Sequence, residues 1–257
     1  MLADLTAGAL ADASERRAGR SLRVVEAAAI ARPAALDALA ALAPEDRVKI
    51  IAEIKRSSPS RGALADIADP AALAVSYETG GASAISVLTE GRQFGGSLAD
   101  LESVRESVSI PVLRKDFIAE PYQVFEARAA GADIVLLIVA ALEQPRLVEL
   151  HALIAQLGMT ALVETHDAEE VARALDLGAG LLGVNARNLS TFELDRDLFG
   201  SLADQIPSGV IRVAESAVQS AADVAHYRSA GADVVLVGEA LVTGDPITTL
   251  HEFLAAS

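Results

Sequence analysis

A repeated step from glycine into a strand constrains the fold of this chain more than any other feature. Four times a helical pattern ends at a glycine followed by alanine, and an apolar segment with β-branched residues comes next. Glycine commonly ends helices because it has no Cβ and adopts left-handed backbone conformations freely. The step begins at Gly81, Gly131, Gly178 and Gly231, so it recurs about every 50 residues. Each repeat is therefore expected to contribute one helix and one buried strand to a common core.

Four more apolar segments lie between these strands, which brings the expected number of strands to eight. The expected strands are 50–55, 83–88, 111–117, 134–139, 160–166, 181–185, 210–216 and 234–239. The expected helices are 70–79, 97–107, 121–130, 143–157, 167–177, 197–205, 219–229 and 246–256. Strands that alternate with helices imply right-handed crossovers and a parallel sheet.

Eight such units predict an α/β fold of the (β/α)8 TIM barrel type, with residues 1–257 in a single barrel domain. The alternative is an open, doubly wound sheet, but the G-x-G-x-x-G turn usual after its first strand is missing. Residues 1–43 carry apolar side chains at helical spacing, such as Leu2, Leu5 and Ala9. Because this segment is too short to bury its own core, we expect a helical extension packed on the barrel.

Composition excludes several functional classes. The formal net charge of −15 disfavours binding to nucleic acid or to anionic membrane surfaces. The chain has no cysteine, so disulfides, a thiol nucleophile and a cysteine-based zinc site are excluded. The N-terminal residues include Asp4 and Asp12 and lack the pattern of a signal peptide. We therefore expect a soluble cytoplasmic protein with no membrane span.

Charged residues end every second strand of the predicted barrel. Glu53 and Lys55 lie two residues apart on the first strand, so both side chains point to the same face. Lys115, Glu164 and Glu215 stand at the same end of the third, fifth and seventh strands. For any single residue a structural ion pair is the alternative interpretation. Residues of both signs at one barrel mouth favour a site for proton transfer, since neighbouring charges shift one another's pKa values.

Other residues near this mouth have side chains suited to a small anionic substrate. Asn185 and Arg187 follow the sixth strand, and an arginine can hold a carboxylate through two hydrogen bonds. Ser216 and Gly238 end the last two strands, where backbone N–H groups of TIM barrels often bind phosphate. The loop 56–62, rich in serine and arginine, is expected to lie beside them.

Aromatic and histidine residues leave more than one interpretation open. Phe94, between a polar stretch and two glycines, and Phe117 could stack on a flat substrate, or Phe94 could simply anchor its loop. His166 and Asp167 follow Glu164 and suggest a metal site, but the ligand set is incomplete and lysines crowd the mouth. We therefore expect no metal.

Eight motifs in order resemble one family. They are IAEIKRSSPSRG, SVLTEGRQFGGS, PVLRKDFI, GADIVLLIV, ALVETHD, GVNARNL, RVAES and VLVGEAL. Together they resemble the indole-3-glycerol phosphate synthases of tryptophan biosynthesis, from about Ile50 to the end of the chain, and a helical N-terminal extension is also a family feature. The resemblance implies ring closure of 1-(2-carboxyphenylamino)-1-deoxyribulose 5-phosphate with loss of CO2 and water, and no cofactor.

The resemblance also implies residue roles. Lys115 is similar to the general acid and Glu164 to the general base. Lys55 is similar to the lysine that holds the substrate carboxylate, and Glu53 and Asn185 would position these groups. The remaining substrate-binding positions are Arg187, Phe94, Phe117, Leu136, Ser58, Glu215 and Leu236, and the phosphate-binding positions are Ser216, Ala217, Gly238 and Glu239.

Ala217 departs from the family pattern, which usually has glycine there. If this residue needs a positive φ, alanine costs roughly 1 kcal/mol of strain, and we expect weaker phosphate binding. Two alternative functions stay open: another phosphate-binding barrel enzyme such as phosphoribosylanthranilate isomerase, whose family relies on a cysteine absent here, and a non-catalytic scaffold. Association with other enzymes of the tryptophan pathway is also left open.

Overall fold

Eight parallel strands close into a barrel in this computed structural model, which describes residues 1–59, 61–188 and 193–256. The strands are β1 Lys49–Ile54, β4 Ala84–Leu88, β5 Val112–Lys115, β6 Ile134–Ile138, β7 Thr160–Thr165, β8 Leu181–Asn185, β9 Ile211–Glu215 and β10 Val234–Val237. The predicted (β/α)8 TIM barrel is confirmed. Most strands end one or two residues earlier than predicted, because the chain leaves the sheet where it turns over the mouth.

The first strand closes the ring by pairing on both sides. Ala52 of β1 is in register with Val237 of β10 and with Ile85 of β4, and both pairings are parallel. The order around the barrel is β1-β10-β9-β8-β7-β6-β5-β4. All the strands therefore end at one mouth, and β1 lies across the barrel from β7, as β5 does from β9.

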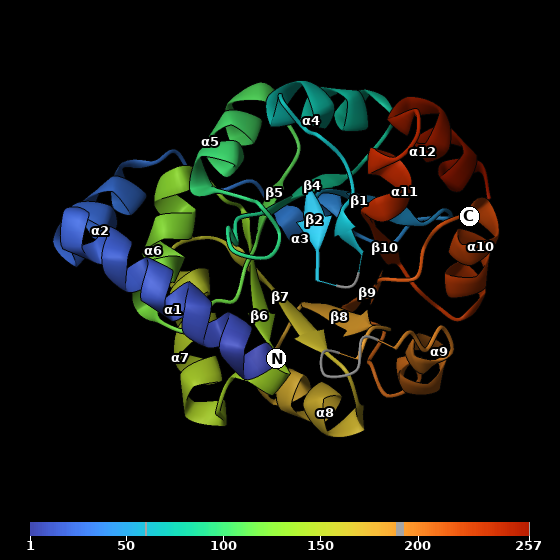
Figure 1. The fold of residues 1–257 in the computed structure, drawn as a ribbon. Coiled ribbons are helices and arrows are strands. Elements are labelled where there is room, and N and C mark those ends of the chain that lie inside the picture. Colours follow the sequence, from blue (N-terminus) through green and yellow to red (C-terminus); the bar gives the residue numbers. More distant parts are fainter. Residues whose placement is uncertain (60, 189–192, 257) are drawn as a thin grey trace.

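The helices alternate with the strands and cover the outside of the barrel (Figure 1). They are α4 Pro70–Thr79, α5 Leu98–Ser107, α6 Pro121–Ala130, α7 Gln144–Gln156, α8 Ala168–Asp176, α9 Leu198–Ala203, α10 Ala221–Ser229 and α12 Pro246–Ala255. Side chains that accept hydrogen bonds from the first turn begin five of them: Asp69, Ser97, Asp167, Ser220 and Asp245. Such caps satisfy backbone N–H groups that have no partner within the helix.

A hairpin of two short strands, a 3-10 turn and a short helix were not predicted. The polar loop after β1 forms a hairpin, β2 Ser57–Ser58 and β3 Gly62–Ala63, where an irregular turn was expected. A 3-10 turn, η1 Val139–Ala141, follows β6. The helix α11 Glu239–Val242 begins where the eighth strand was expected to end. All three lie next to the mouth, where the chain reverses direction and strand patterning no longer applies.

Two apolar layers surround the strands. Inside the barrel, side chains of alternate residues, including Ile51, Leu113, Leu162 and Val213, pack against one another. Residues of opposite parity, such as Ile50, face the helices in the larger outer layer. This alternation is the reason that the charged residues at the strand ends point into the mouth.

The N-terminal segment packs on α6 and on the interior layer of the barrel. It contains α1 Leu2–Gly19, α2 Leu22–Ala31 and α3 Ala38–Ala41. Figure 1 shows α1 running past α6 and ending, at its N-terminus, near the barrel strands. The helix α2 packs on α6, and Ala38 and Leu42 join the interior layer of the barrel. From these contacts we propose that residues 1–43 form one domain with the barrel.

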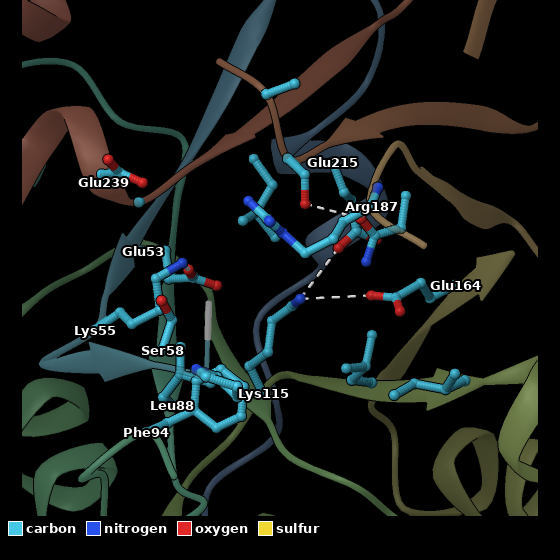
Figure 2. Close-up of a pocket in the computed structure, with 18 of the residues that line it drawn as sticks. Glu53, Lys55, Ser58, Leu88, Phe94, Lys115, Glu164, Arg187, Glu215 and Glu239 are labelled. Atoms are coloured by element: carbon cyan, nitrogen blue, oxygen red, sulfur yellow. Dashed lines mark hydrogen bonds and ion pairs between the residues drawn. The ribbon is translucent and has the colours of Figure 1, made fainter. Parts of the chain in front are cut away.

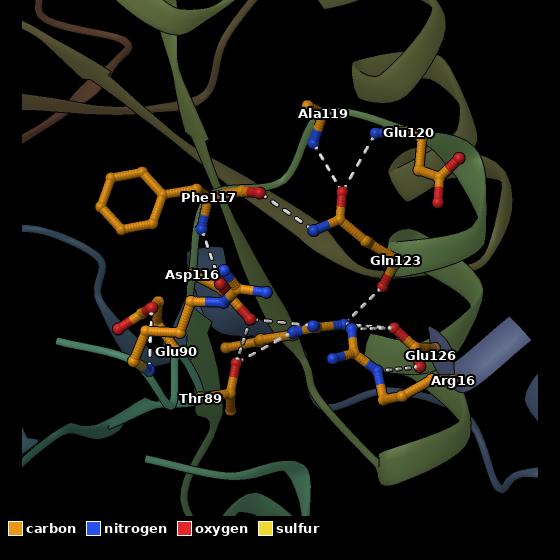
Figure 3. A network of polar contacts seen from close by, with 11 residues as sticks. Arg16, Thr89, Glu90, Asp116, Phe117, Ala119, Glu120, Gln123 and Glu126 are labelled. Carbon is orange, nitrogen blue, oxygen red and sulfur yellow. Dashed lines mark hydrogen bonds and ion pairs between the residues drawn. The ribbon is translucent and has the colours of Figure 1, made fainter. Parts of the chain in front are cut away.

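A buried polar network joins this segment to β5 (Figure 3). The Arg114 side chain is fully buried; its Nη2 lies 2.9 Å from Asp116 Oδ2, and its Nη1 donates to the Gln123 carbonyl at 2.7 Å. Glu126 on α6 faces Arg114 at 3.7 Å and accepts two hydrogen bonds from Arg16 on α1, at 2.6 and 2.8 Å. The network therefore links α1 to the residues on both sides of Lys115.

No helix in the described ranges is both long and apolar enough to span a bilayer.

We predict that Arg114→Ala lowers the free energy of unfolding by about 3–5 kcal/mol, because it leaves the buried Asp116 carboxylate without its cation. Chemical denaturation followed by circular dichroism measures this. The matched control is Arg146→Ala, which breaks the exposed ion pair of Arg146 with Glu149 and should cost about 0.5 kcal/mol or less. Equal stability of the two variants would contradict the prediction.

Candidate active site

One pocket at the carboxyl ends of the strands is lined by every residue that the sequence predicted for the site (Figure 2). These residues are Glu53, Lys55, Ser58, Phe94, Lys115, Phe117, Leu136, Glu164, Asn185, Arg187, Glu215, Ser216, Ala217, Leu236, Gly238 and Glu239. They come from seven strands and the loops that follow them, and Phe94 comes from the loop after the eighth strand, β4. Barrel closure has therefore brought together residues that are far apart in the chain.

Lys115 lies between two carboxylates at the centre of the pocket. Its Nζ is 3.4 Å from Glu164 Oε2 and 3.2 Å from Glu215 Oε2, and all three side chains are buried or nearly so. Burial disfavours the ammonium, but the carboxylates of Glu215, Glu164 and Glu53 outweigh burial and raise the pKa of Lys115. Lys115 therefore keeps its proton at neutral pH.

The two carboxylates beside Lys115 differ in their surroundings. Burial opposes ionisation of Glu164, yet Lys115 and His166 overcome it and lower the Glu164 pKa. Burial, together with the negative charge of Glu164, raises the pKa of Glu215 to about 8, although Lys115 opposes this. One carboxyl is thus ionised at neutral pH while the other holds a proton.

Glu53 and Lys55 form a second ion pair on the opposite side from Glu164. Glu53 Oε1 lies 2.6 Å from Lys55 Nζ. Burial disfavours the carboxylate, but Lys55 and Lys115 overcome it and lower the pKa of Glu53. A Cβ on Gly238 would lie only 2.6 Å from Glu53 Oε1, so glycine leaves the space that this carboxylate fills.

Asn185 organises the adjoining loops. Its Oδ1 accepts hydrogen bonds from Ser216 Oγ at 2.7 Å and from the Arg187 backbone N–H at 3.0 Å. Both Ser216 and Ala217 have a positive φ, of 68° and 58°. The condition set for Ala217 from the sequence is therefore met, because its backbone does adopt the left-handed conformation that favours glycine.

The opposite wall of the pocket is apolar. The rings of Phe94 and Phe117 have centroids 6.2 Å apart and are tilted by 42°. Phe94 is held by its loop, since its backbone N–H donates to Glu90 Oε2 at 3.0 Å. Leu136 of β6 extends this wall within the barrel, and Leu236 of β10 lies across the barrel from it. A planar aromatic group would fit against these side chains.

Glu239 carries a negative charge on the side of the pocket expected to bind phosphate. Its Oε1 lies 3.1 Å from Arg61 Nη2, which comes from the hairpin after β1. The arginine offsets the carboxylate charge and links the hairpin to the start of α11.

Several residues at the site were not found from the sequence. Leu5 of α1 lines the pocket, although its helical spacing indicated only a packing role. Gly183 on β8 leaves room for Glu215, because a Cβ there would lie 2.1 Å from Glu215 Oε1. A glycine inside a strand often marks such a close approach, so this signal was available. The other additional lining residues are Pro59, Leu88, Asp116, Ile138, Leu194, Val218 and Gln219.

His166 faces two carboxylates, Glu164 and Glu170. Within the described ranges, no group of three or more His, Cys, Asp or Glu side chains is arranged to hold a metal ion.

Comparison with known proteins identifies the family. A sequence model of indole-3-glycerol phosphate synthase matches residues 2–253. The chain belongs to the indole-3-glycerol phosphate synthase family. It is 75% identical over 253 residues to the indole-3-glycerol phosphate synthase of Leifsonia xyli, a match that covers 98% of this chain and 97% of that protein. The corresponding protein of Beutenbergia cavernae is 57% identical over 257 residues, covering 100% of this chain and 95% of that one.

Solved structures of more distant proteins share the fold alone. A thiamine phosphate pyrophosphorylase from Pyrococcus furiosus superposes with a TM-score of 0.61 at 13% identity, over 81% of this chain and 94% of that one. A structure described as native KDPGal has a TM-score of 0.58 at 17% identity, over 82% and 95% of the two chains. The sequence matches thus show the family, and the two solved structures share only the fold.

We predict that Gly183→Ala lowers the free energy of unfolding by about 1–3 kcal/mol, because the added methyl group must displace the buried Glu215 carboxyl. The matched control is Gly209→Ala, where a Cβ meets no atom within 4 Å. Thermal and chemical denaturation of both variants measure the difference. If Gly183→Ala unfolds like the control, the close packing of Glu215 against β8 is wrong.

Proposed function

We propose that the chain converts 1-(2-carboxyphenylamino)-1-deoxyribulose 5-phosphate into indole-3-glycerol phosphate, with release of CO2 and water. The observation that carries this proposal is the position of Lys115, with its Nζ 3.4 and 3.2 Å from two carboxylates in a buried pocket. Membership of the family and names of the relatives support the same reaction.

Ring closure needs an acid at the carbonyl oxygen of the substrate. The aromatic carbon that bears the carboxylate attacks the carbonyl carbon, and Lys115 gives a proton to the oxygen. The ring then carries a positive charge, which the ionised carboxylates of Glu164 and Glu53 stabilise electrostatically. Loss of CO2 returns the bonding electrons to the ring and removes this charge.

Dehydration needs an acid and a base on opposite sides of the intermediate. Lys55 follows β1 and Glu164 ends β7, which lie across the barrel from each other. Lys55 supplies a proton to the departing hydroxyl group, and Glu164 removes a proton from the ring system. Because the two groups approach from opposite walls, neither can neutralise the other while the substrate lies between them.

The two ends of the substrate match the two sides of the pocket. Phe94, Phe117 and Leu136 suit the anthranilate ring, with Arg187 and Lys55 near its carboxylate and Ser58 at the rim; Leu236 lies on the other side of the pocket, next to β9. The positive-φ turn of Ser216 and Ala217, with Gly238 and Glu239, is the proposed phosphate side. Arg61 offsets the charge of Glu239 there.

A cytoplasmic location, expected from the composition and the N-terminal residues, and catalysis without a cofactor, implied by the family resemblance, stay predictions. Association with other enzymes of the tryptophan pathway stays open. A different phosphate-binding barrel enzyme and a non-catalytic scaffold are not favoured, because the relatives at 57–75% identity carry the synthase name.

The proposed reaction is tested by following indole fluorescence after adding the carboxyphenylamino deoxyribulose phosphate to the purified protein. We predict that Lys115→Ala lowers kcat by a factor of about 100 to 10,000, as expected for loss of a general acid. Lys49→Ala, which removes a lysine at the other end of the barrel, is the matched control and should keep its activity. An inactive wild-type protein, or an active Lys115→Ala variant, would contradict the proposal.

Ala217→Gly should lower KM for the substrate by up to about fivefold, which corresponds to relief of about 1 kcal/mol of strain. Glycine adopts the observed φ of 58° freely and lets the backbone N–H adjust to the phosphate. Ala152→Gly, on the exposed face of α7, is the control; it should lower stability by about 1 kcal/mol and leave KM unchanged. An unchanged or higher KM for Ala217→Gly would count against this role.

A further inference from the structure

His166 lies directly behind the proposed general base. It follows Glu164 by two residues at the end of β7, so both side chains are directed to the same side of the strand. Its Nε2 is 3.4 Å from Glu164 Oε1, while the other oxygen of Glu164 faces Lys115 at 3.4 Å. The His166 side chain is only 14% exposed. Glu164 is therefore held between two basic side chains, one on each oxygen.

Glu170 fixes the orientation of the His166 ring. His166 Nδ1 lies 3.0 Å from Glu170 Oε2, and the same oxygen accepts a hydrogen bond from the His166 backbone N–H at 2.8 Å. Glu170 is itself held at the first turn of α8, where its backbone N–H donates to Asp167 Oδ1 at 2.9 Å. The sequence His166-Asp167 followed by Glu170 thus forms both the helix cap and the support of the imidazole.

We propose that His166 is a positioning residue which, as an imidazolium held by Glu170, keeps the Glu164 carboxylate ionised and directed into the pocket. This inference rests on the proposed function, in which Glu164 is the general base. A base must lose its proton before each turnover, and burial works against that loss. The imidazolium offsets the cost of burial on the side of Glu164 that Lys115 does not reach.

The charged groups around His166 agree with this role. Glu164 on its own strand and Glu170 on α8 face the ring, and Lys115 of β5 and Glu215 of β9 lie beyond Glu164. The neighbouring strands β6 and β8 contain no ionisable residue. Burial alone would lower the pKa of His166, but Glu164 and Glu170 outweigh it and raise this pKa to about 10. The ring is therefore charged at neutral pH.

The test is the dependence of kcat on pH for the wild-type protein, His166→Gln, His166→Lys and Glu170→Gln. Without the imidazolium the Glu164 pKa should rise, because an opposite charge at this distance lowers a carboxyl pKa by about 1–3 units. We expect the acidic limb of the kcat profile to move up by a similar amount in His166→Gln. The shift should be smaller in Glu170→Gln, and His166→Lys should largely reverse it by restoring the charge.

The matched control is His226→Gln. His226 also faces a carboxylate, with its Nε2 3.5 Å from Asp197 Oδ1, but it lies on α10 outside the pocket. Its removal should leave the profile unchanged. Thermal denaturation of each variant shows whether it is folded. A folded His166→Gln protein with the wild-type profile would overturn the proposal, as would a loss of kcat by the same factor at every pH.

A second measurement does not depend on turnover. NMR titration of protein labelled with 13C at the glutamate carboxyl carbons gives the Glu164 pKa, with Glu164→Gln assigning the signal. A higher Glu164 pKa in His166→Gln supports the proposal, and an equal value overturns it. If the wild-type protein does not convert the substrate, the proposed function fails, while the titration still decides whether His166 controls the ionisation of Glu164.

Discussion

Closure of the parallel barrel is the constraint on which the rest of the structure depends. The strand β1 pairs with β10 on one side and with β4 on the other, so no edge is left open and every strand ends at the same mouth. Around this ring β1 lies across from β7 and β5 across from β9. The charged ends of alternate strands therefore lie at four evenly spaced positions around one mouth, although they are far apart in the chain.

Bringing these charges together in a buried space forces them to compensate one another. Lys115 reaches two carboxylates, and Lys55 pairs with Glu53 on the neighbouring quarter of the ring. Lys115 and His166 both lower the pKa of Glu164, whereas Lys115 alone acts against burial at Glu215. Glu164 therefore ionises while Glu215 retains a proton near neutral pH. Residues of the same type thus acquire different acid strengths from their neighbours alone, which is what stepwise proton transfer requires.

The N-terminal segment is joined to this chemistry through polar as well as apolar contacts. Arg16 binds Glu126, which faces Arg114, and Arg114 stands directly before Lys115 in β5. At the other end of α1, Leu5 contributes to the pocket wall. The extension therefore supports the strand that carries the proposed acid and also closes part of the site.

The parts of the fold and site that could be predicted are those that leave a pattern in nearby residues of the chain. Glycine steps and strand periodicity predicted the barrel, and residue parity along the strands predicted that Lys115, Glu164 and Glu215 would share one mouth. Leu5 could not be found in this way, since its helical spacing is the same whether it packs on the barrel or lines the pocket. The hairpin after β1 was missed because its pairing depends on the conformation of a short polar loop.

The sequence by itself determined the order of helices and strands, the side of each strand on which a residue lies, and the chemical types at the mouth. These follow from backbone geometry, which repeats every two or 3.6 residues. Only the tertiary structure decided which charges are paired, that Gly183 makes room for Glu215, and that His166 faces Glu164 with Glu170 behind it. Those contacts join atoms through space at distances set by barrel closure and side-chain rotamers, which no spacing along the chain specifies.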